Sequence, residues 1–157
     1  MTELQCAQRV REHLVTRGIA YDITEHAKTF TAQALAEAEH VSGRKVAKPV
    51  ILMVEGNLLM TVLAAVDHVS MTRARDEFGT ADVRLATEGE FGGVFGDCEL
   101  GAEPPFGMLY GLPTYIDEHL LEADELIFSA GSHVHSMRIA LNDYLVAAQP
   151  TKARLTN

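Results

Sequence analysis

The sequence predicts one α/β domain, spanning residues 1–157, in which at least part of the sheet is antiparallel. Three observations support this fold class. The apolar pattern switches between helical and strand periods along the whole chain, with no repeat or low-complexity linker. Residues 46–54 and 58–66 are two apolar runs separated by Glu-Gly-Asn, which is typical of a β-hairpin. The length and a hydrophobic content of 47% suit one domain that buries its own core.

The N-terminal part of the chain predicts two helices on either side of a strand. Residues 4–17 place apolar side chains at near-helical spacing and are followed by a glycine, which readily ends a helix. Residues 19–24 alternate apolar and polar side chains, as a half-buried strand does. Thr31 is a suitable N-cap for the Ala-rich stretch that runs to about His40.

The middle and C-terminal parts predict short helices, strands and one long loop. Residues 70–78 begin with a Ser N-cap and end before a glycine, which predicts a helix. A strand is expected at 82–85, and the Thr-x-x-Glu pattern at 87–90 is a capping box that opens another short helix. A Gly- and Pro-rich loop follows at 96–107. Three further strands and a final helix are predicted at residues 112–116, 125–129, 136–140 and 142–148.

Composition and missing motifs exclude several classes of function. The chain has 13 Lys and Arg residues against 22 Asp and Glu residues, which gives a net charge of 13 − 22 = −9. This charge repels a phosphate backbone at long range, so we expect no DNA partner and no broad nonspecific binding to nucleic acid. The sequence contains neither GxGxxG nor GxxxxGK[ST], so a doubly wound nucleotide-binding fold is not expected.

The location expected from the sequence is the cytoplasm. The N-terminal stretch mixes charges with apolar residues and lacks the continuous apolar run of a signal peptide, and no run is long enough to cross a bilayer. We therefore expect no membrane partner. The two cysteines, Cys6 and Cys98, lie in different contexts without CxxC spacing, and we expect both to be reduced thiols. Acidic neighbours on both sides of Cys98 disfavour a thiolate nucleophile there.

Four short segments, taken in order, form a family pattern. Residues 46–52 read VAKPVIL, with a lysine inside an apolar strand, and residues 101–107 read GAEPPFG, which fits a GxxxP loop. Residues 112–117 read LPTYID, and residues 127–133 read IFSAGSH. Together the segments resemble the YbaK/ProX family of aminoacyl-tRNA deacylases, whose relatives also occur as an editing domain inserted in bacterial prolyl-tRNA synthetases.

The resemblance implies a fold and an activity. The fold would be α/β, with a mixed, largely antiparallel, barrel-like sheet surrounded by helices. The activity would be trans-editing, in which the ester that links a small amino acid to the terminal adenosine of a mischarged tRNA is hydrolysed. A tRNA of the proline or alanine class is expected, with its acceptor end and an aminoacyl-tRNA synthetase as partners. No cofactor is expected, because the sequence gives no signal for one. The resemblance implies that the substrate's own ribose hydroxyl helps to activate the water, so no Ser/His/Asp triad is required.

The resemblance and the chemistry of ester hydrolysis together select candidate site residues. Lys48 would anchor the phosphate or ribose of the terminal adenosine, with Lys45 as the next candidate. Gly101 opens a loop whose N–H groups can converge on the carbonyl oxygen as negative charge develops there. We assign catalysis to these two residues, Lys48 and Gly101. Substrate binding is expected from Pro105, Ala102, Asp117, Gly131 and His133.

Two departures from the family pattern keep other functions open. Pro49 follows Lys48 where some relatives have Asn or Thr, and it removes a backbone donor from the strand. Glu103 and Pro104 stand in the loop where common relatives have small or hydroxyl residues, which adds a negative charge beside the expected substrate. The main alternative is a noncatalytic module that binds aminoacyl-tRNA or a synthetase, and a third is hydrolysis of another small acyl ester or amide.

Histidines raise one further alternative, a metal site. His133 and His135 would face the same way on a strand, and with Asp67 and His68 they offer nitrogen and oxygen ligands. This spacing is common in proteins, so we favour no metal. Phe30 is a candidate for the wall of a small pocket, although an aromatic residue is more often part of the core.

Overall fold

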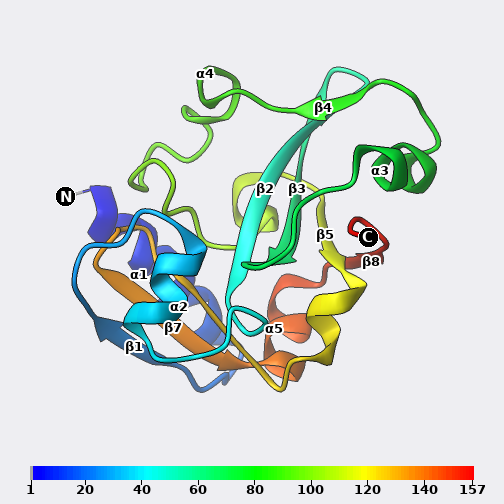
Figure 1. Cartoon of the computed structure of the whole chain (residues 1–157). Coiled ribbons are helices and arrows are strands. Elements are labelled where there is room, and N and C mark those ends of the chain that lie inside the picture. Colours follow the sequence, from blue (N-terminus) through cyan, green and yellow to red (C-terminus); the bar gives the residue numbers. More distant parts are fainter. Residues whose placement is uncertain (1) are drawn as a thin grey trace.

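Two β-sheets form the centre of the molecule, with helices packed around them, in the computed structural model, which describes residues 2–157 (Figure 1). The smaller sheet has the order β1 (Asp22–Glu25), β7 (His135–Ala140) and β6 (Glu125–Ser129). Both of its pairings are antiparallel. Figure 1 shows this sheet below the long β2–β3 hairpin, which runs up the middle of the molecule.

The larger sheet contains the hairpin and is mixed. Its order is β4 (Val83–Leu85), β2 (Ala47–Val54), β3 (Asn57–Ala64), β5 (Thr114–Asp117) and β8 (Thr151–Ala153). Strands β4, β2 and β3 pair antiparallel, whereas β3 with β5 and β5 with β8 pair parallel. The predicted α/β class with a mixed, largely antiparallel sheet is confirmed.

The helices follow the predicted order and their ends have the predicted caps. Thr31 and Ser70 each accept a backbone N–H of the first helical turn, and Gly79 ends its helix in the left-handed region with φ 66°. Thr87 and Glu90 form both halves of the capping box. The helices are α1 (Thr2–Thr16), α2 (Ala32–Ala38), α3 (Met71–Phe78), α4 (Glu88–Phe91) and α5 (Leu141–Ala148), with 3₁₀ turns η1 (Gly107–Tyr110) and η2 (Glu118–Glu122). None of the helices within residues 2–157 has both the length and the apolar character of a membrane span.

The two sheets are joined at one point instead of closing into a barrel. Val46 and Ile127 form a parallel bridge, and the Ile127 N–H donates to the carbonyl oxygen of Lys45 at 2.9 Å. Strand β6 otherwise pairs with β7, and the larger sheet ends at β8, which has three residues. The protein therefore has two sheets that meet at this bridge, which we call the seam, instead of the barrel-like sheet that we expected. Lys48 lies two residues from that seam.

An aromatic cluster in the core fixes the position of the Gly- and Pro-rich loop. The fully buried rings of Phe128 and Tyr144 pack edge-on against Phe106, with ring centroids 5.4 Å and 5.3 Å from it. The hydroxyl of Tyr144 donates to the carbonyl oxygen of Pro105 at 2.5 Å. Because the loop residues before Phe106 carry the expected site, this cluster holds one wall of that site in place.

Some strand boundaries differ from the prediction. Strand β1 begins at Asp22 rather than at residue 19, because Ile19 takes part in the turn that closes α1. Its N–H donates to the carbonyl oxygen of Leu14 after Gly18 turns with φ 68°. Strand β8 and turn η2 were not predicted. Two of the three β8 residues are exposed, so the strand has no apolar alternation, and its place in the sheet comes from pairing with β5.

The cysteines form a disulfide, so the expectation of two reduced thiols is wrong. Cys6 on α1 is bonded to Cys98 in the loop that follows α4, across 92 residues of sequence. The hydroxyl of Tyr110 lies 3.4 Å and 3.3 Å from the two sulfurs and donates to the carboxylate of Asp97 at 2.9 Å. Burial and this carboxylate raise the pKa of Tyr110. The disulfide thus ties α1 to the segment that leads into Gly101.

Candidate functional site

The candidate site is a pocket of about 190 Å³ between the start of α2, strand β2 and the loop after α4. Lys48, Gly101 and His133, which come from three separate parts of the chain, all line it. The other lining residues are Thr29, Phe30, Thr31, Ala32, Leu35, Ala47, Pro49, Phe91, Glu103 and Ser129. The pocket therefore draws on both sheets, through β2 on one side and the end of β6 on the other.

Lys48 is half-buried on β2 and is held by backbone carbonyls. Its Nζ donates to the carbonyl oxygen of Asp67 at 2.5 Å and to that of Ala65 at 3.4 Å. Burial lowers the pKa of the Lys48 ammonium, and the nearby carboxylate of Asp67 partly opposes that shift. No carboxylate pairs directly with Lys48 among the ion pairs of the described side chains, which leaves its charge available to an anionic ligand.

The neighbouring cations are already paired. Arg44 lies 3.3 Å from the carboxylate of Asp67, and Lys45 lies 3.0 Å from that of Asp124. Lys45 does not line the pocket. Lys48 is thus better placed than Lys45 to meet a ligand.

The conformation of Gly101 explains why glycine stands at this position. Its φ is +89°, a region that side chains disfavour, and a Cβ there would lie 3.4 Å from Cε1 of His133. Its N–H donates to both carboxylate oxygens of Glu103, at 3.0 Å and 2.8 Å. The donor that we expected to face the substrate carbonyl is therefore occupied by a side chain of the same loop.

Replacing Gly101 with alanine should lower both stability and any activity of the pocket. The positive φ costs a residue with a Cβ about 1–2 kcal/mol, and the added Cβ would also lie against His133, at the lower limit of an ordinary contact. Gly56, in the β2–β3 turn, has a similar φ of +80°, but a Cβ at this position would meet nothing within 4 Å, so Gly56→Ala is the matched control. Thermal unfolding should show a larger loss for Gly101→Ala. Equal losses would mean that the contact with His133 is unimportant.

His133 forms a wall of the pocket and is held by two hydrogen bonds and one ring contact. Its Nε2 donates to the carbonyl oxygen of Leu100 at 2.9 Å, and its backbone N–H donates to the carboxylate of Glu99 at 2.8 Å. The ring of Phe30 lies against it, with centroids 4.9 Å apart. With 9% of its surface exposed, His133 is suited to shape the pocket rather than to carry protons through it.

Three of the other predicted residues hold the loop in place without lining the pocket. The Gly131 N–H donates to the carbonyl oxygen of Ala102 at 3.0 Å, and the Gly131 carbonyl oxygen accepts from the Glu99 N–H at 2.8 Å. Ala102 is fully buried, and Pro105 is held by Tyr144. None of Ala102, Pro105 and Gly131 lines the pocket, so we assign them to positioning the loop rather than to contact with substrate.

Asp117 lies away from the pocket, at the end of β5. Its fully buried carboxylate accepts from the Leu155 N–H at 2.8 Å and from the Thr156 hydroxyl at 2.9 Å. It also accepts from the His119 N–H at 3.2 Å. These contacts tie the C-terminal segment to the larger sheet, which is a structural role and not the substrate binding that we expected.

The histidine pair does not form a metal site with Asp67. Among the described residues, the groups of potential ligands within 4.8 Å of one another are Asp67 with Asp117 and His119, and Asp97 with the two disulfide cysteines. His135 instead bonds through Nδ1 to the hydroxyl of Ser132 at 2.7 Å. Ser132 is 2% exposed, so this pair is not an accessible nucleophile and base.

Glu103 is the pocket residue whose contacts the sequence did not reveal. Its side chain is 7% exposed and curls back onto Gly101, which no local pattern indicates. Burial raises the pKa of the Glu103 carboxyl, and the negative charge of Glu88 adds to that effect, while the Gly101 N–H and His133 oppose it. Phe91 and Ser129 also line the pocket and carried no signal of their own in the sequence.

The variant Glu103→Gln should unfold at a higher temperature than the wild type at neutral pH. A carboxyl whose pKa is raised by folding binds more protons in the folded state, so stability falls as pH rises from about 4.5 through the raised value. The amide keeps an oxygen for the Gly101 N–H but carries no buried charge. Each kcal/mol recovered should raise Tm by roughly 2–4 °C at pH 7, and the gain should shrink near pH 4. A gain that does not depend on pH would contradict the raised pKa.

A second hollow adjoins the pocket and extends it along β2. It has a volume of about 310 Å³ and shares four lining residues with the first: Lys48, Pro49, Phe91 and Glu103. Its remaining wall is mostly apolar and includes Leu85, which is 55% exposed. Lys48 and Glu103 therefore lie where the two hollows meet.

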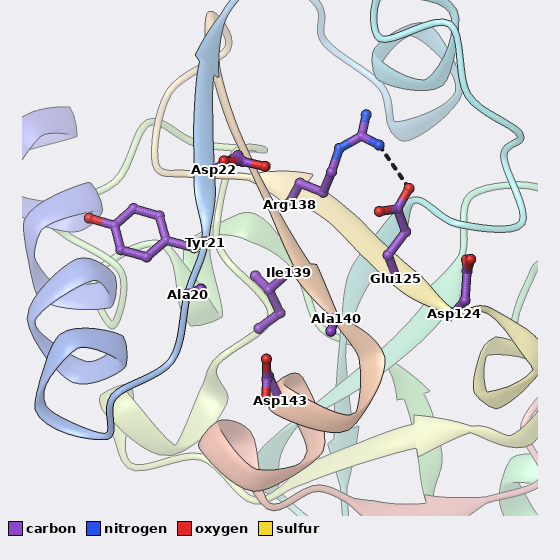
Figure 2. A pocket seen from close by; sticks show the side chains of 9 residues that line it. All are labelled: Ala20, Tyr21, Asp22, Asp124, Glu125, Arg138, Ile139, Ala140 and Asp143. Carbon is purple, nitrogen blue, oxygen red and sulfur yellow. Dashed lines mark hydrogen bonds and ion pairs between the residues drawn. The ribbon is translucent and has the colours of Figure 1, made fainter.

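Another pocket, of about 330 Å³, lies between β1, β6, β7 and α5 and has a different character (Figure 2). Arg138 is the one cation among its lining residues, and its guanidinium lies 2.7 Å from the carboxylate of Glu125. Figure 2 marks this ion pair with a dashed line. Three further carboxylates, those of Asp22, Asp124 and Asp143, line it. This acidic lining disfavours an anionic ligand.

Comparison with known proteins gives the family. A family model described as "Aminoacyl-tRNA editing domain" matches residues 26–146. The "Multifunctional Ser/Thr-tRNA deacylase ProXp-y" of Escherichia coli (strain K12) is 28% identical over 148 residues, which cover 91% of this chain and 88% of that protein.

Solved structures agree with this match. A structure described as a candidate trans-editing enzyme for prolyl-tRNA synthetase is 26% identical, covers 97% of each chain and has a TM-score of 0.83. A hypothetical protein at 19% identity, covering 95% of this chain and 99% of its own, has a TM-score of 0.84 and supports the fold alone. The pocket that contains Lys48, Gly101 and His133 lies within the matched residues, and the chain belongs to the aminoacyl-tRNA editing domain family.

Proposed function

We propose that the protein is a freestanding editing hydrolase that deacylates mischarged aminoacyl-tRNA. The observation that carries this proposal is the meeting of Lys48, Gly101 and His133 in one pocket, although they come from distant parts of the chain. Family membership supplies the reaction class, and the relatives that are named as a deacylase and as a candidate trans-editing enzyme agree with it. The reaction takes place in the cytoplasm, where tRNA is charged.

The substrate is a small amino acid esterified to the terminal adenosine of tRNA. The pocket of about 190 Å³ admits a small side chain, and its walls at Phe30, Leu35 and Phe91 exclude a large one. A tRNA of the proline or alanine class is the first candidate. Serine and threonine are the first candidate amino acids, because the E. coli relative is named a Ser/Thr-tRNA deacylase.

Each pocket residue has a distinct part in the proposed reaction. Lys48 binds the phosphate or ribose of the terminal adenosine from the junction of the two hollows. The loop that begins at Gly101 lies against the aminoacyl group, and His133 forms the wall behind it. Ester hydrolysis also needs an activated water and donors for the oxyanion. Ser129 and His133 both line the pocket, but His133 directs its Nε2 to the Leu100 carbonyl oxygen rather than to a hydroxyl. The ribose hydroxyl of the substrate is therefore the group that we assign to help activate the water.

A panel of charged tRNAs tests the proposal. Release of Ala, Cys, Ser, Thr and Pro from their mischarged and correctly charged tRNAs would be followed with the wild-type protein at a concentration well below that of substrate. We expect multiple turnovers of at least one mischarged species. Stoichiometric binding without turnover would instead identify a noncatalytic module.

One observation favours the second candidate function, a noncatalytic binding module. The Gly101 N–H is occupied by Glu103, so the expected donor is not free for a substrate carbonyl. A module that binds aminoacyl-tRNA or a synthetase would not need this donor. Hydrolysis of tRNA-free aminoacyl esters would point to the third alternative, a broader esterase.

Recognition of tRNA is confined to the acceptor end in this proposal. The net charge of −9 opposes wide contact with phosphates, and the nearby Arg44 and Lys45 are paired with acidic residues. Binding should therefore be weak unless a partner synthetase delivers the tRNA.

The salt dependence of binding should accordingly be shallow. Neutralising one or two phosphates of a single-stranded end gives a slope of about −0.7 to −1.4 in a plot of log affinity against log salt. Titration of a labelled acceptor-stem RNA at several salt concentrations measures this slope. A slope steeper than about −3 would reveal many phosphate contacts and would contradict recognition of the acceptor end alone.

A further inference from the structure

Glu103 is a buried acidic residue that the proposed hydrolysis does not use. Its side chain lines both hollows, and 7% of its surface is exposed. Among the side chains that the structure describes, none of the ion pairs includes it. The Gly101 N–H, which donates to its carboxylate, is a neutral group. A buried carboxylate without a cation is costly, so the site would be stabilised by a ligand that brings a positive charge.

Neither His133 nor Lys48, the basic residues that line the pocket, directs its side-chain nitrogen to the carboxylate of Glu103. His133 directs its Nε2 to the Leu100 carbonyl oxygen, and Lys48 directs its Nζ to the carbonyl oxygens of Ala65 and Asp67. The exposed Glu88, in the adjoining hollow, adds negative charge nearby. A cation that enters the pocket therefore meets an acidic wall at Glu103.

An aminoacyl ester carries a suitable cation. Its α-ammonium is attached to the carbon next to the carbonyl that is to be hydrolysed, so both groups must enter the pocket together. The site offers a carboxylate at Glu103 and an ammonium at Lys48, where the two hollows meet. These opposite charges match a ligand with an ammonium at one end and a phosphodiester at the other, and they would fix its direction in the site.

We propose that Glu103 binds the α-ammonium of the aminoacyl group and makes the pocket specific for aminoacyl adenosines with a free amine. This inference rests on the proposed function for its ligand, since it names the part of the same substrate that the loop recognises. It assigns Glu103 to binding and orientation rather than to proton transfer. An N-acylated aminoacyl group, which has no charge at this position, is accordingly a poor ligand.

Binding of stable analogues tests the inference whether or not the protein turns over substrate. The probes are 3′-(alanylamino)-3′-deoxyadenosine and 3′-(serylamino)-3′-deoxyadenosine, with their N-acetyl forms, measured by calorimetry. The wild type should bind the free-amine form at least about tenfold more tightly than the N-acetyl form, as expected for a charge-assisted hydrogen bond. Glu103→Gln should lose most of that preference, while its amide oxygen still accepts from Gly101.

Glu88→Gln is the matched control, because it also removes a negative charge beside the hollow but from an exposed residue. It should keep the preference for the free amine. If wild type binds both forms of each probe equally or binds neither, or if Glu103→Gln keeps the preference, the inference is overturned.

Kinetics on the best tRNA substrate separate this inference from the proposed function. Glu103→Gln should raise KM by about tenfold and leave kcat within about twofold. A fall in kcat at unchanged KM would assign Glu103 to the water instead of the ammonium. Absence of turnover by the wild type, with the free-amine preference retained in binding, would overturn the hydrolase proposal and leave the inference standing.

Discussion

The variant Lys48→Ala is expected to lose roughly 30- to 10³-fold in kcat/KM for deacylation. Among the side chains that the structure describes, no carboxylate pairs directly with Lys48 in the pocket, and a charge-assisted contact with a phosphate or a developing oxyanion contributes about 2–4 kcal/mol. Initial rates on the best substrate of the tRNA panel measure the loss. The fold should persist, because the side chain is only half-buried and contacts two carbonyl oxygens in the segment that follows β3.

Lys45→Ala is the control for that loss. Lys45 precedes the same strand but is paired with Asp124 and lies outside the pocket. Its replacement should leave kcat/KM within about twofold, since an exposed ion pair contributes little. A folded Lys48→Ala protein with full activity would remove Lys48 from the mechanism, and a loss shared equally by Lys45→Ala would point to general electrostatics.

Reduction of the Cys6–Cys98 disulfide is expected to lower the free energy of unfolding by roughly 4–5 kcal/mol. The bond closes a loop across 92 residues, and the entropy that it removes from the unfolded chain increases with loop length. For a chain of this size, that change corresponds to a fall in Tm of roughly 10–20 °C. Thermal unfolding with and without a thiol reductant measures it.

The double variant Cys6→Ala with Cys98→Ala separates the bond from other effects of the reductant. Its Tm should lie near that of the reduced wild type and should not change when reductant is added. Two thiols that react with maleimide in the untreated, unfolded wild-type protein, with a Tm insensitive to reductant, would show that the bond does not form.

Local sequence patterns predicted the elements whose causes are local. The hairpin over β2 and β3, the Thr31 and Ser70 caps and the capping box at Thr87 depend on neighbouring residues, and all are confirmed. Strand β8 depends instead on pairing with β5, and two of its three side chains face solvent. A strand defined by its partner has no periodicity of its own to detect.

The candidate site was predictable in part, and only with the family resemblance. Lys48, Gly101 and His133 line one pocket, but the motif that contains Asp117 belongs to the support of the C-terminal segment. The contact of Glu103 with Gly101 depends on the left-handed turn of the loop. The disulfide depends on how α1 packs against a loop 92 residues away, and cysteine spacing carries no information about that.

Because the pocket lies between two sheets, a movement of one sheet relative to the other would change the shape of the pocket without disrupting either sheet. One side of the pocket belongs to β2 and the other follows β6, and these strands meet at the bridge between Val46 and Ile127. A ligand that contacts both sides of the pocket would hold the two sheets together. Amide exchange at Ile127, whose N–H crosses the seam to Lys45, should then slow when ligand is bound, while exchange within the β2–β3 hairpin stays unchanged.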